Sequence, residues 1–294
     1  MGAPTKPTAL ALDVGGTWVK SAPVTSDGEL LEEPRVAPID SHADAQTIFG
    51  TLATVINHYL AGKQALQLRG IALGFPGPFD YAGGISYIQG VSKYEAIYGL
   101  DVGAALRSRV LTPHLPIVFR NDAEAAVIGE AQYGAGRGYS RAIGVTLGTG
   151  MGSAFVVDGA PVTTGPGVPP NGWLYSFPAG DAQADDVFSI RGLLARLQAV
   201  DAQISDIRNA AALAHAGNAS FQEVFAQWGS DLGAFLRPFA LAFQAQVILA
   251  LGGIANAFDC FGPALTSALP IPAVPGELGT NAALVGAAEL IFRS

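Results

Sequence analysis

Residues 10–20 read LALDVGGTWVK, an apolar run that ends on a carboxylate and is followed by two glycines and a threonine. Because glycine has no Cβ, the backbone N–H groups of Gly15 and Gly16 can approach a phosphate closely. Asp13 at the strand end can hold a hydrated Mg²⁺ ion, and Thr17 can donate to a phosphoryl oxygen. A tight hairpin turn explains the same glycine pair, so this stretch alone leaves both interpretations open.

A second stretch follows the same plan. Residues 142–159, AIGVTLGTGMGSAFVVDG, repeat the order of residues 9–24: strand, glycine–threonine turn, strand. Two such turns could bind the two ends of a polyphosphate. The repeated pattern also predicts that the protein consists of two related α/β units. Neither turn has the G-K-[ST] sequence of a Walker A loop, and neither joins a strand to a helix as G-x-G-x-x-G does. The pattern therefore disfavours a P-loop and a dinucleotide fold.

Two strand–helix junctions add polar groups. LGGIAN at 251–256 follows an apolar strand and precedes a helix, so it can seat a nucleoside or serve as an ordinary turn. FRNDA at 119–123 closes a strand and opens a helix, where Asn121 and Asp122 suit an N-cap. The Asp122 carboxylate can also accept the proton of a hydroxyl that attacks a phosphoryl group. Capping and catalysis are compatible at this position.

The composition predicts a compact protein of about two domains. The chain has 294 residues, of which 50% are apolar and 14% charged, and its net charge of −8 disfavours nucleic acid as a partner. The single cysteine, Cys260, excludes an internal disulfide and predicts no zinc site. Signal-peptide features and an unbroken apolar run of membrane-spanning length are absent from the sequence, which predicts a cytoplasmic protein.

Alternating strands and helices indicate α/β architecture with largely parallel sheets. We expect an N-terminal lobe over residues 1–118, joined by a C-terminal helix at 281–294, and a second lobe over 119–280. Residues 160–183 are rich in proline and glycine and are expected to form a long loop.

Taken together, these stretches resemble the ROK family of sugar kinases, which also contains sugar-responsive repressors. LDVGGTWVK resembles the first phosphate motif of the family, GVTLGTGMG the second, and LGGIAN the adenosine motif. RGIALGFPGPFDYAGG resembles its strand and loop near the sugar, and NDAEAAVIGEA its Asn-Asp-Ala helix. The resemblance implies a two-lobed, actin-like ATPase fold related to ribonuclease H, with a cleft between the lobes. It also implies ATP and Mg²⁺ as cofactors and a homodimer.

The resemblance also implies roles for individual residues. Asp122 becomes the general base, and Asp13 a ligand of Mg²⁺ through water. The implied ATP-binding residues are Asp13, Gly15, Gly16, Thr17, Lys20, Gly148, Thr149, Gly150, Gly252, Gly253 and Asn256. The implied substrate-binding residues are Gly77, Asn121, Asp122 and Asp186. Trp173 is a further candidate for substrate binding.

The chain departs from the family pattern at the sugar site. Where the family has Glu-x-Gly-His, this sequence has Pro170-Asn171-Gly172-Trp173, and the Cys-rich zinc loop of many members is missing, so no zinc is expected. Trp173 offers an apolar face that can stack on a sugar ring, or it packs within its loop. Because hydroxyl-binding groups decide which sugars a site rejects, we expect a substrate other than glucose: another hexose, a ketose, an amino sugar or a cyclitol.

A further departure lies in residues 90–106, where family members have Asn-Leu-x-x-Trp. Gln89, Ser92, Lys93 and Tyr94 are the candidates to reach a ligand there. Lys93 suits an anionic substrate, or it is a solvated loop lysine.

The sequence thus predicts an ATP-dependent kinase of a sugar or sugar-like polyol. The alternative is a non-catalytic sugar sensor of the same fold. DNA binding by such a sensor is disfavoured by the acidic charge and by the short stretch before the first strand. Polyphosphate as the phosphoryl donor is disfavoured by the low content of Lys and Arg. The identity of the sugar and of the phosphorylated hydroxyl stays open.

Overall fold

The computed structural model describes residues 6–61 and 68–293, and it divides the chain into two compact units. Unit 1 comprises Met1–Gly129 and Asn281–Ser294, and unit 2 comprises Glu130–Thr280. The division falls inside helix α3 (Asp122–Tyr133) rather than at 118/119. The reason is that strand β7 (Ile117–Asn121) pairs with β4 (Leu68–Phe75) and so belongs to the sheet of unit 1.

The sheet of unit 1 has the strand order β3-β2-β1-β4-β7. Strands β1 (Thr8–Val14), β2 (Trp18–Thr25) and β3 (Arg35–Pro38) form an antiparallel meander, and β4 and β7 run parallel to β1. Large and small residues alternate along β1: Leu10 and Leu12 pack into the main core of the unit, and Ala11 lies between them in the chain. Because successive side chains of a strand point to opposite faces, this alternation places large side chains on one face of the sheet and small side chains on the other.

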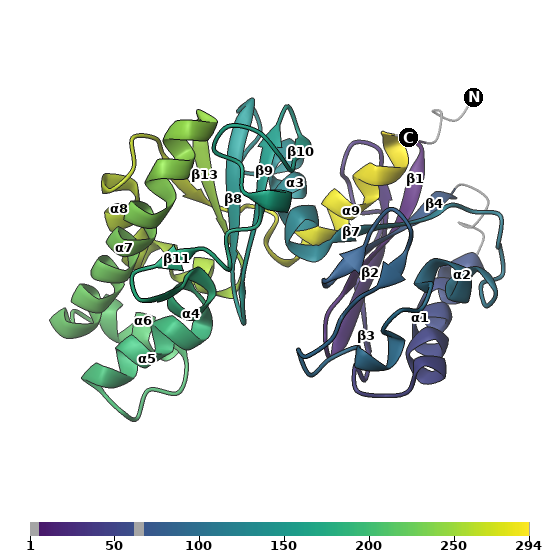
Figure 1. The fold of residues 1–294 in the computed structure, drawn as a ribbon, viewed down its shortest axis with the longest axis horizontal. Helices are drawn as coiled ribbons and strands as arrows, with labels where there is room; N and C mark the ends of the chain where they lie inside the picture. Colours follow the sequence, from purple (N-terminus) through teal and green to yellow (C-terminus); the bar gives the residue numbers. More distant parts are fainter. Residues whose placement is uncertain (1–5, 62–67, 294) are drawn as a thin grey trace. The chain divides into compact units, whose positions relative to one another are not determined.

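Helices cover the sheet of unit 1. Asp44 is the N-cap of helix α1 (Ala45–Leu60), and its carboxylate accepts a 2.8 Å hydrogen bond from Thr47 N. The helix buries an apolar stripe. The C-terminal helix α9 (Ala282–Phe292), at the yellow end of the colour bar in Figure 1, packs on β1 and β4. A Cβ on Gly286 would lie 1.8 Å from Ala125 O, so only glycine lets α9 lie this close to α3.

Unit 2 contains a second sheet with the same plan, in the order β10-β9-β8-β13-β14. Strands β8 (Arg141–Leu147), β9 (Met151–Val157) and β10 (Ala160–Val162) are antiparallel, whereas β13 (Val247–Leu251) and β14 (Ala273–Pro275) run parallel to β8 (Figure 1). The sequence echo between the two hairpins therefore reflects two related sheets, and the α/β prediction is confirmed. The core of this unit contains a chain of aromatic rings, with Phe188, Trp228 and Phe261 in successive contacts.

The remaining elements are short strands, 3-10 turns and the helices of unit 2. The stretch 160–183 was expected to be a loop, but it also contains β10 and two short paired strands. The other elements are β5 (Phe79–Asp80), β6 (Ile85–Ser86), η2 (Glu95–Ile97), α2 (Val102–Arg107), η3 (Pro170–Gly172), β11 (Pro178–Ala179), β12 (Ala182–Gln183), α4 (Ala184–Phe188), α5 (Ile190–Val200), α6 (Ile207–His215), α7 (Ala219–Phe243), η4 (Gly253–Ala257), α8 (Phe258–Ser267) and η5 (Gly279–Asn281).

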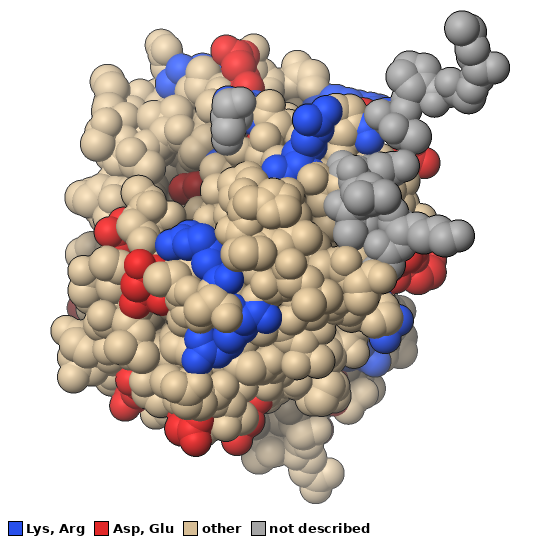
Figure 2. Space-filling view, turned by 90° about the vertical axis from the view of Figure 1, so that its right-hand side faces the viewer, with Lys and Arg blue, Asp and Glu red and all other residues tan. Residues whose placement is uncertain are grey.

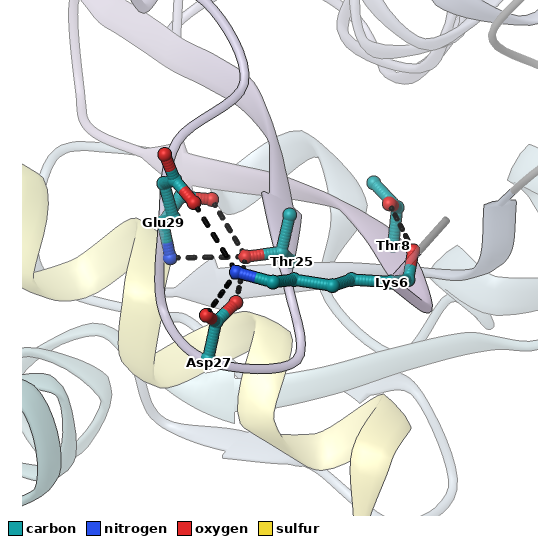
Figure 3. A network of polar contacts seen from close by, with 5 residues as sticks. All are labelled: Lys6, Thr8, Thr25, Asp27 and Glu29. Carbon is teal, nitrogen blue, oxygen red and sulfur yellow. Dashed lines mark hydrogen bonds and ion pairs between the residues drawn. The ribbon is translucent and has the colours of Figure 1, made fainter. Parts of the chain in front are cut away.

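A polar network closes the open end of the β1–β2 hairpin, at the opposite end from its glycine turn (Figure 3). Thr25 Oγ1 donates to Asp27 Oδ1 at 2.5 Å and accepts from Glu29 N at 3.1 Å. The Lys6 ammonium pairs with the carboxylates of Asp27 and Glu29, and Thr8 Oγ1 donates to Lys6 O at 3.1 Å. The ion pairs are solvated and contribute little to stability, so the Thr25 turn is what sets the geometry here.

On the face shown in Figure 2, basic and acidic side chains form separate small groups within a largely uncharged area. Within residues 6–61 and 68–293, no helix combines the length and apolar character needed to cross a membrane.

Candidate active site

The first glycine turn joins β1 to β2 in unit 1. Gly15 N donates to Trp18 O at 2.9 Å, which closes the turn, so this amide serves the hairpin itself. The Tyr94 hydroxyl donates to Gly15 O at 2.5 Å, and the Tyr94 side chain is fully buried. Gly15 and Thr17 are exposed and Gly16 is half-buried. Tyr94 therefore fixes the turn from within the core, which leaves the outer side of the turn for a ligand.

Asp13 lies at the end of β1, directly opposite Lys20 of β2 in the strand register. Burial and the nearby Asp122 carboxylate raise the pKa of Asp13 to about 6, against the opposing effect of Lys20. The Lys20 ammonium donates to Asn281 Oδ1 at 2.6 Å, and burial lowers the pKa of Lys20. Lys20 was predicted to bind ATP; its side chain is engaged at the start of α9 and next to Asp13.

Asp122 is the first residue of α3, immediately after β7. Its carboxylate accepts a 2.8 Å hydrogen bond from Ala123 N, and the side-chain oxygen of Asn121 accepts from Glu124 N at 3.1 Å. Both residues thus satisfy amides in the first turn of the helix. Burial raises the pKa of Asp122, and the Ala123 amide and the positive charge of Lys93 partly oppose this rise. A carboxylate with a raised pKa is suited to proton transfer near neutral pH.

Asn121 is held by Tyr81, a residue that the sequence analysis missed. Asn121 Nδ2 donates to the Tyr81 hydroxyl at 3.1 Å, and this hydroxyl donates to Phe75 O at 3.1 Å. A Cβ on Gly77 would lie 3.0 Å from the same hydroxyl and 3.9 Å from Asn121 Nδ2, so Gly77 and Asn121 are neighbours at this hydroxyl. The signal was available, because Tyr81 stands within the stretch GFPGPFDYAGG that carries the resemblance.

Lys93 lies beside the first turn. Its Cδ is 3.9 Å from the position that a Cβ of Gly16 would take. Both neighbours adopt left-handed backbone, Ser92 with φ 55° and Tyr94 with φ 56°, and Tyr94 N donates to Ser41 O at 2.7 Å. Such backbone is unfavourable for non-glycine residues and persists where surrounding contacts impose it. Tyr94 was predicted to reach a ligand, but its hydroxyl is bound to Gly15 O, so it positions the turn instead.

The second glycine turn joins β8 to β9 in unit 2 and contains Gly148, Thr149 and Gly150. Gly148 N donates to Gly150 O at 3.1 Å. Asp185 Oδ1 accepts from Met151 N at 2.7 Å and lies 3.0 Å from the position of a Cβ on Gly150. A carboxylate from α4 therefore supports this turn, a contact that the sequence analysis did not identify.

Asp186, the predicted substrate ligand, lies next to Asp185 but makes a different contact. Arg191 Nη2 donates to Asp186 Oδ1 at 2.8 Å and to Asp185 Oδ2 at 3.2 Å. Asp186 is exposed and Asp185 is half-buried. The arginine holds both carboxylates in the first turn of α4.

The LGGIAN stretch lies beside the second turn. Gly252 has φ 87°, and a Cβ there would lie 2.6 Å from Leu147 O, the last residue of β8. Only glycine permits this approach of β13 to β8. Gly253 and Asn256 lie within η4 and are exposed. The structure thus brings the predicted nucleoside motif and the predicted second phosphate motif together within unit 2.

Trp173 follows a segment that is fixed to β9. Ser153 Oγ donates to Gly172 O at 2.7 Å and accepts from Leu174 N at 2.8 Å. The half-buried Trp173 ring lies 6.2 Å from that of Tyr175, which is exposed. The loop that replaces Glu-x-Gly-His is therefore ordered by β9 and carries two neighbouring aromatic rings.

The predicted site residues form two groups, each within one unit. Unit 1 holds Asp13, Gly15, Gly16, Thr17, Lys20, Gly77, Asn121 and Asp122. Unit 2 holds Gly148, Thr149, Gly150, Trp173, Asp186, Gly252, Gly253 and Asn256.

Comparison with known proteins gives consistent matches. The family model described as the ROK family matches residues 9–293. A glucokinase of Halalkalibacterium halodurans is 30% identical over 156 residues, which are 51% of this chain and 44% of that protein. The chain thus matches less than half the length of this curated relative.

Two solved structures match over nearly their whole length. An inorganic polyphosphate/ATP-glucomannokinase from Arthrobacter sp. strain KM is 25% identical, with a TM-score of 0.71 over 98% of this chain and 99% of that one. A ROK family glucokinase from Streptomyces griseus in complex with glucose and AMPPNP is 21% identical, with a TM-score of 0.74 over 98% of this chain and 100% of that one. The second likeness supports the fold alone.

Proposed function

The chain belongs to the ROK family, and we propose that it transfers a phosphoryl group from ATP to a hydroxyl of a sugar or sugar-like polyol. The observation that carries this proposal is the Asp122 carboxylate, whose pKa is raised by burial at the start of α3. It stands next to an asparagine held by Tyr81 and in the same unit as the first glycine turn. The relatives compared above are described as kinases of sugars.

In the proposed reaction, Asp122 accepts the proton of the substrate hydroxyl as that oxygen attacks the terminal phosphorus of ATP. The new bond joins the hydroxyl oxygen to phosphorus, the bond to the bridging oxygen breaks, and ADP leaves with the electron pair. Asn121 orients a neighbouring hydroxyl, and Tyr81 keeps the Asn121 amide in one rotamer through its hydrogen bond. The N–H groups on the outer side of the first turn bind phosphate oxygens.

The carboxylates of unit 1 fit a hydrated Mg²⁺ ion. Burial and, after it, the charge of the nearby Asp122 carboxylate raise the pKa of Asp13 to about 6, so two carboxylates influence each other there. Oxygen ligands in small number, completed by water, are what Mg²⁺ prefers. Asp13 would hold the ion through water, and the ion would neutralise charge on the phosphates.

Two features suggest a substrate other than glucose. Pro170 and Trp173 stand where the family pattern has Glu and His, so an apolar ring replaces two hydroxyl-binding groups. Lys93 places a positive charge near Asp122 and Gly16, which favours negative charge on the phosphoryl group in transfer or on an acidic substituent of the sugar. Comparing neutral sugars with the corresponding acid sugars separates these two roles of Lys93.

The test is an ADP-release assay over hexoses, ketoses, amino sugars, acid sugars and cyclitols, with wild type and Asp122→Asn. We expect one class to be turned over and kcat to fall about 10²- to 10⁴-fold in the variant, with a melting temperature that does not fall. Asp181→Asn, at an exposed carboxylate of unit 2, is the matched control and keeps full activity. If no compound is turned over while one of them raises the melting temperature, the chain is a sugar sensor and the kinase proposal is wrong.

We also propose that the protein forms a homodimer, by analogy with the family. Light scattering on the purified chain tests this, and a monomer at micromolar concentration would contradict it.

A further inference from the structure

Three side chains with metal-ligating atoms meet in unit 2, at a place that the proposed reaction does not use. His215 is the last residue of α6, and Asp259 and Cys260 lie in the first turn of α8. One ligand atom of each lies within 4.8 Å of the other two. His215 and Asp259 are exposed and Cys260 is half-buried, so solvent reaches the cluster.

The spacing of the histidine and cysteine atoms is that of a tetrahedral zinc site, and the carboxylate lies within reach of it. With zinc–ligand bonds of about 2.0–2.3 Å, neighbouring nitrogen and sulfur ligands lie about 3.5 Å apart, and nitrogen and oxygen about 3.4 Å apart. His215 Nε2 is 3.4 Å from Cys260 Sγ and 2.6 Å from Asp259 Oδ2. The histidine and cysteine thus already have ligand spacing. The Asp259 carboxylate has to move outward by under about 1 Å, which an exposed side chain does by rotation.

The donor set selects the class of cation. When a metal ion binds, Cys260 releases its thiol proton to solvent. The neutral imidazole, the carboxylate and the thiolate then carry a total charge of −2, which balances a divalent ion. Sulfur and imidazole ligands favour zinc and similar transition metals over Mg²⁺ and Ca²⁺, which prefer oxygen. Three protein ligands and a water molecule complete a tetrahedron on the solvent side.

The cluster is not arranged as a cysteine nucleophile with its base. His215 uses the same ring nitrogen, Nε2, toward both the thiol and the carboxylate. In a nucleophilic triad the carboxylate orients the histidine through the other nitrogen. Burial and the Asp259 charge also raise the pKa of Cys260 to about 11, which is opposite to the activation of a thiol.

We propose that His215 Nε2, an Asp259 carboxylate oxygen and Cys260 Sγ bind one divalent cation of the zinc class, with water as the fourth ligand. The ion would tie the C-terminal end of α6 to the N-terminal end of α8. The presence of one cysteine led to the expectation of no zinc site, but a mixed set needs only one sulfur. The proposal does not depend on the kinase reaction, because it involves none of the proposed site residues.

The test uses the full chain, treated with chelator and then titrated with Zn²⁺ or Co²⁺. We expect one equivalent of Zn²⁺ by calorimetry and a rise in melting temperature, because binding to the folded state alone stabilises it. Co²⁺ should give a sulfur-to-metal charge-transfer band and the visible bands of tetrahedral coordination. Cys260→Ser should abolish the charge-transfer band, and His215→Gln should weaken Zn²⁺ binding at least about tenfold.

The matched control is His42→Gln. His42 Nδ1 lies 3.5 Å from Asp40 Oδ1 in a similarly exposed His–Asp pair. It should leave the affinity and the Co²⁺ spectrum unchanged. The proposal is overturned if the wild type binds no Zn²⁺ in the micromolar range. It is also overturned if Cys260→Ser and His215→Gln both bind Zn²⁺ as tightly as the wild type. It is equally overturned if His42→Gln removes binding.

Discussion

The two glycine turns have the same topology but are stabilised differently. Each connects the first two antiparallel strands of a five-stranded sheet. The first turn is held by the buried Tyr94 hydroxyl and has charged side chains around it, with Asp13 at its base and Lys93 at its side. The second turn is supported by the Asp185 carboxylate, which accepts from Met151 N.

This difference indicates that proton transfer is expected at the first turn and ligand binding at the second. Titratable groups whose charges influence one another, Asp13, Asp122 and Lys93, gather at the first turn. At the second turn the groups available to a ligand are backbone groups, and Gly252 packs against Leu147 at the start of the turn. A site with perturbed carboxylates suits proton transfer, and a backbone cradle suits recognition of phosphate and nucleoside. The following predictions test this division.

The largest effect is expected where strands meet beside the second turn. Gly252→Ala should lower the free energy of unfolding by about 3–5 kcal/mol. The positive φ of Gly252 is unfavourable for a residue with a side chain, and a Cβ there would overlap Leu147 O. Gly74→Ala is the matched change in unit 1, since Gly74 pairs with Asp13 and its Cβ would meet only ordinary contacts at 3.6–3.8 Å. Urea denaturation measures both. Equal losses would show that the two sheets are not constrained differently.

Asp13→Asn should stabilise the protein while reducing activity. The folded-state pKa of about 6 lies above the unfolded value of 3.8, so the folded state binds the proton more tightly between these values. Stability from this group is therefore lost as pH rises from about 4 to 6. At pH 8 the neutral variant should gain about 1–3 kcal/mol in free energy of unfolding, measured by denaturation at pH 4 and pH 8. A variant that is less stable at pH 8 would contradict the charge-burial account.

Asp185→Ala should weaken nucleotide binding by about fivefold, which corresponds to about 1 kcal/mol. It removes the acceptor for Met151 N and so loosens the second turn. Asp186→Ala is the control, because it removes only the exposed partner of Arg191. Calorimetry with a non-hydrolysable ATP analogue compares the two variants. If Asp186→Ala instead raises only the KM for sugar, Asp186 is a substrate ligand as predicted from the family pattern.

Lys93→Met should move the acidic limb of the activity profile to higher pH by less than about one unit. Burial raises the pKa of Asp122 and the Lys93 charge lowers it, so removal of that charge raises it further. Activity requires the ionised base and is lost as pH falls through this pKa. The measurement is kcat/KM against pH, with Arg191→Met in unit 2 as a control that should leave the limb in place. If the acidic limb of the profile does not move in Lys93→Met, then Lys93 does not act on Asp122 in the site.

Much of the fold could be predicted from local sequence. Apolar alternation marked both hairpins, and the junction FRNDA marked the start of α3 at Asp122, where the structure begins it. Strand β7 precedes that helix and pairs with β4, a contact that no local pattern reports, so β7 lies in the sheet of unit 1. The roles assigned to the site residues are still predictions. The structure places Gly252 against Leu147 beside the second turn, whereas Asp186 contacts Arg191.

The sequence by itself determined the strand–turn–strand units, their repetition and the residues at their turns, because periodicity and turn chemistry act over a few neighbouring residues. Only the tertiary structure decided which distant groups meet these turns. Tyr94 reaches Gly15 from 79 positions away, and Lys20 reaches Asn281 across 261. His215 lies 44 positions from Asp259. Such contacts depend on how helices pack on the sheets, and packing follows from the whole core rather than from any single segment.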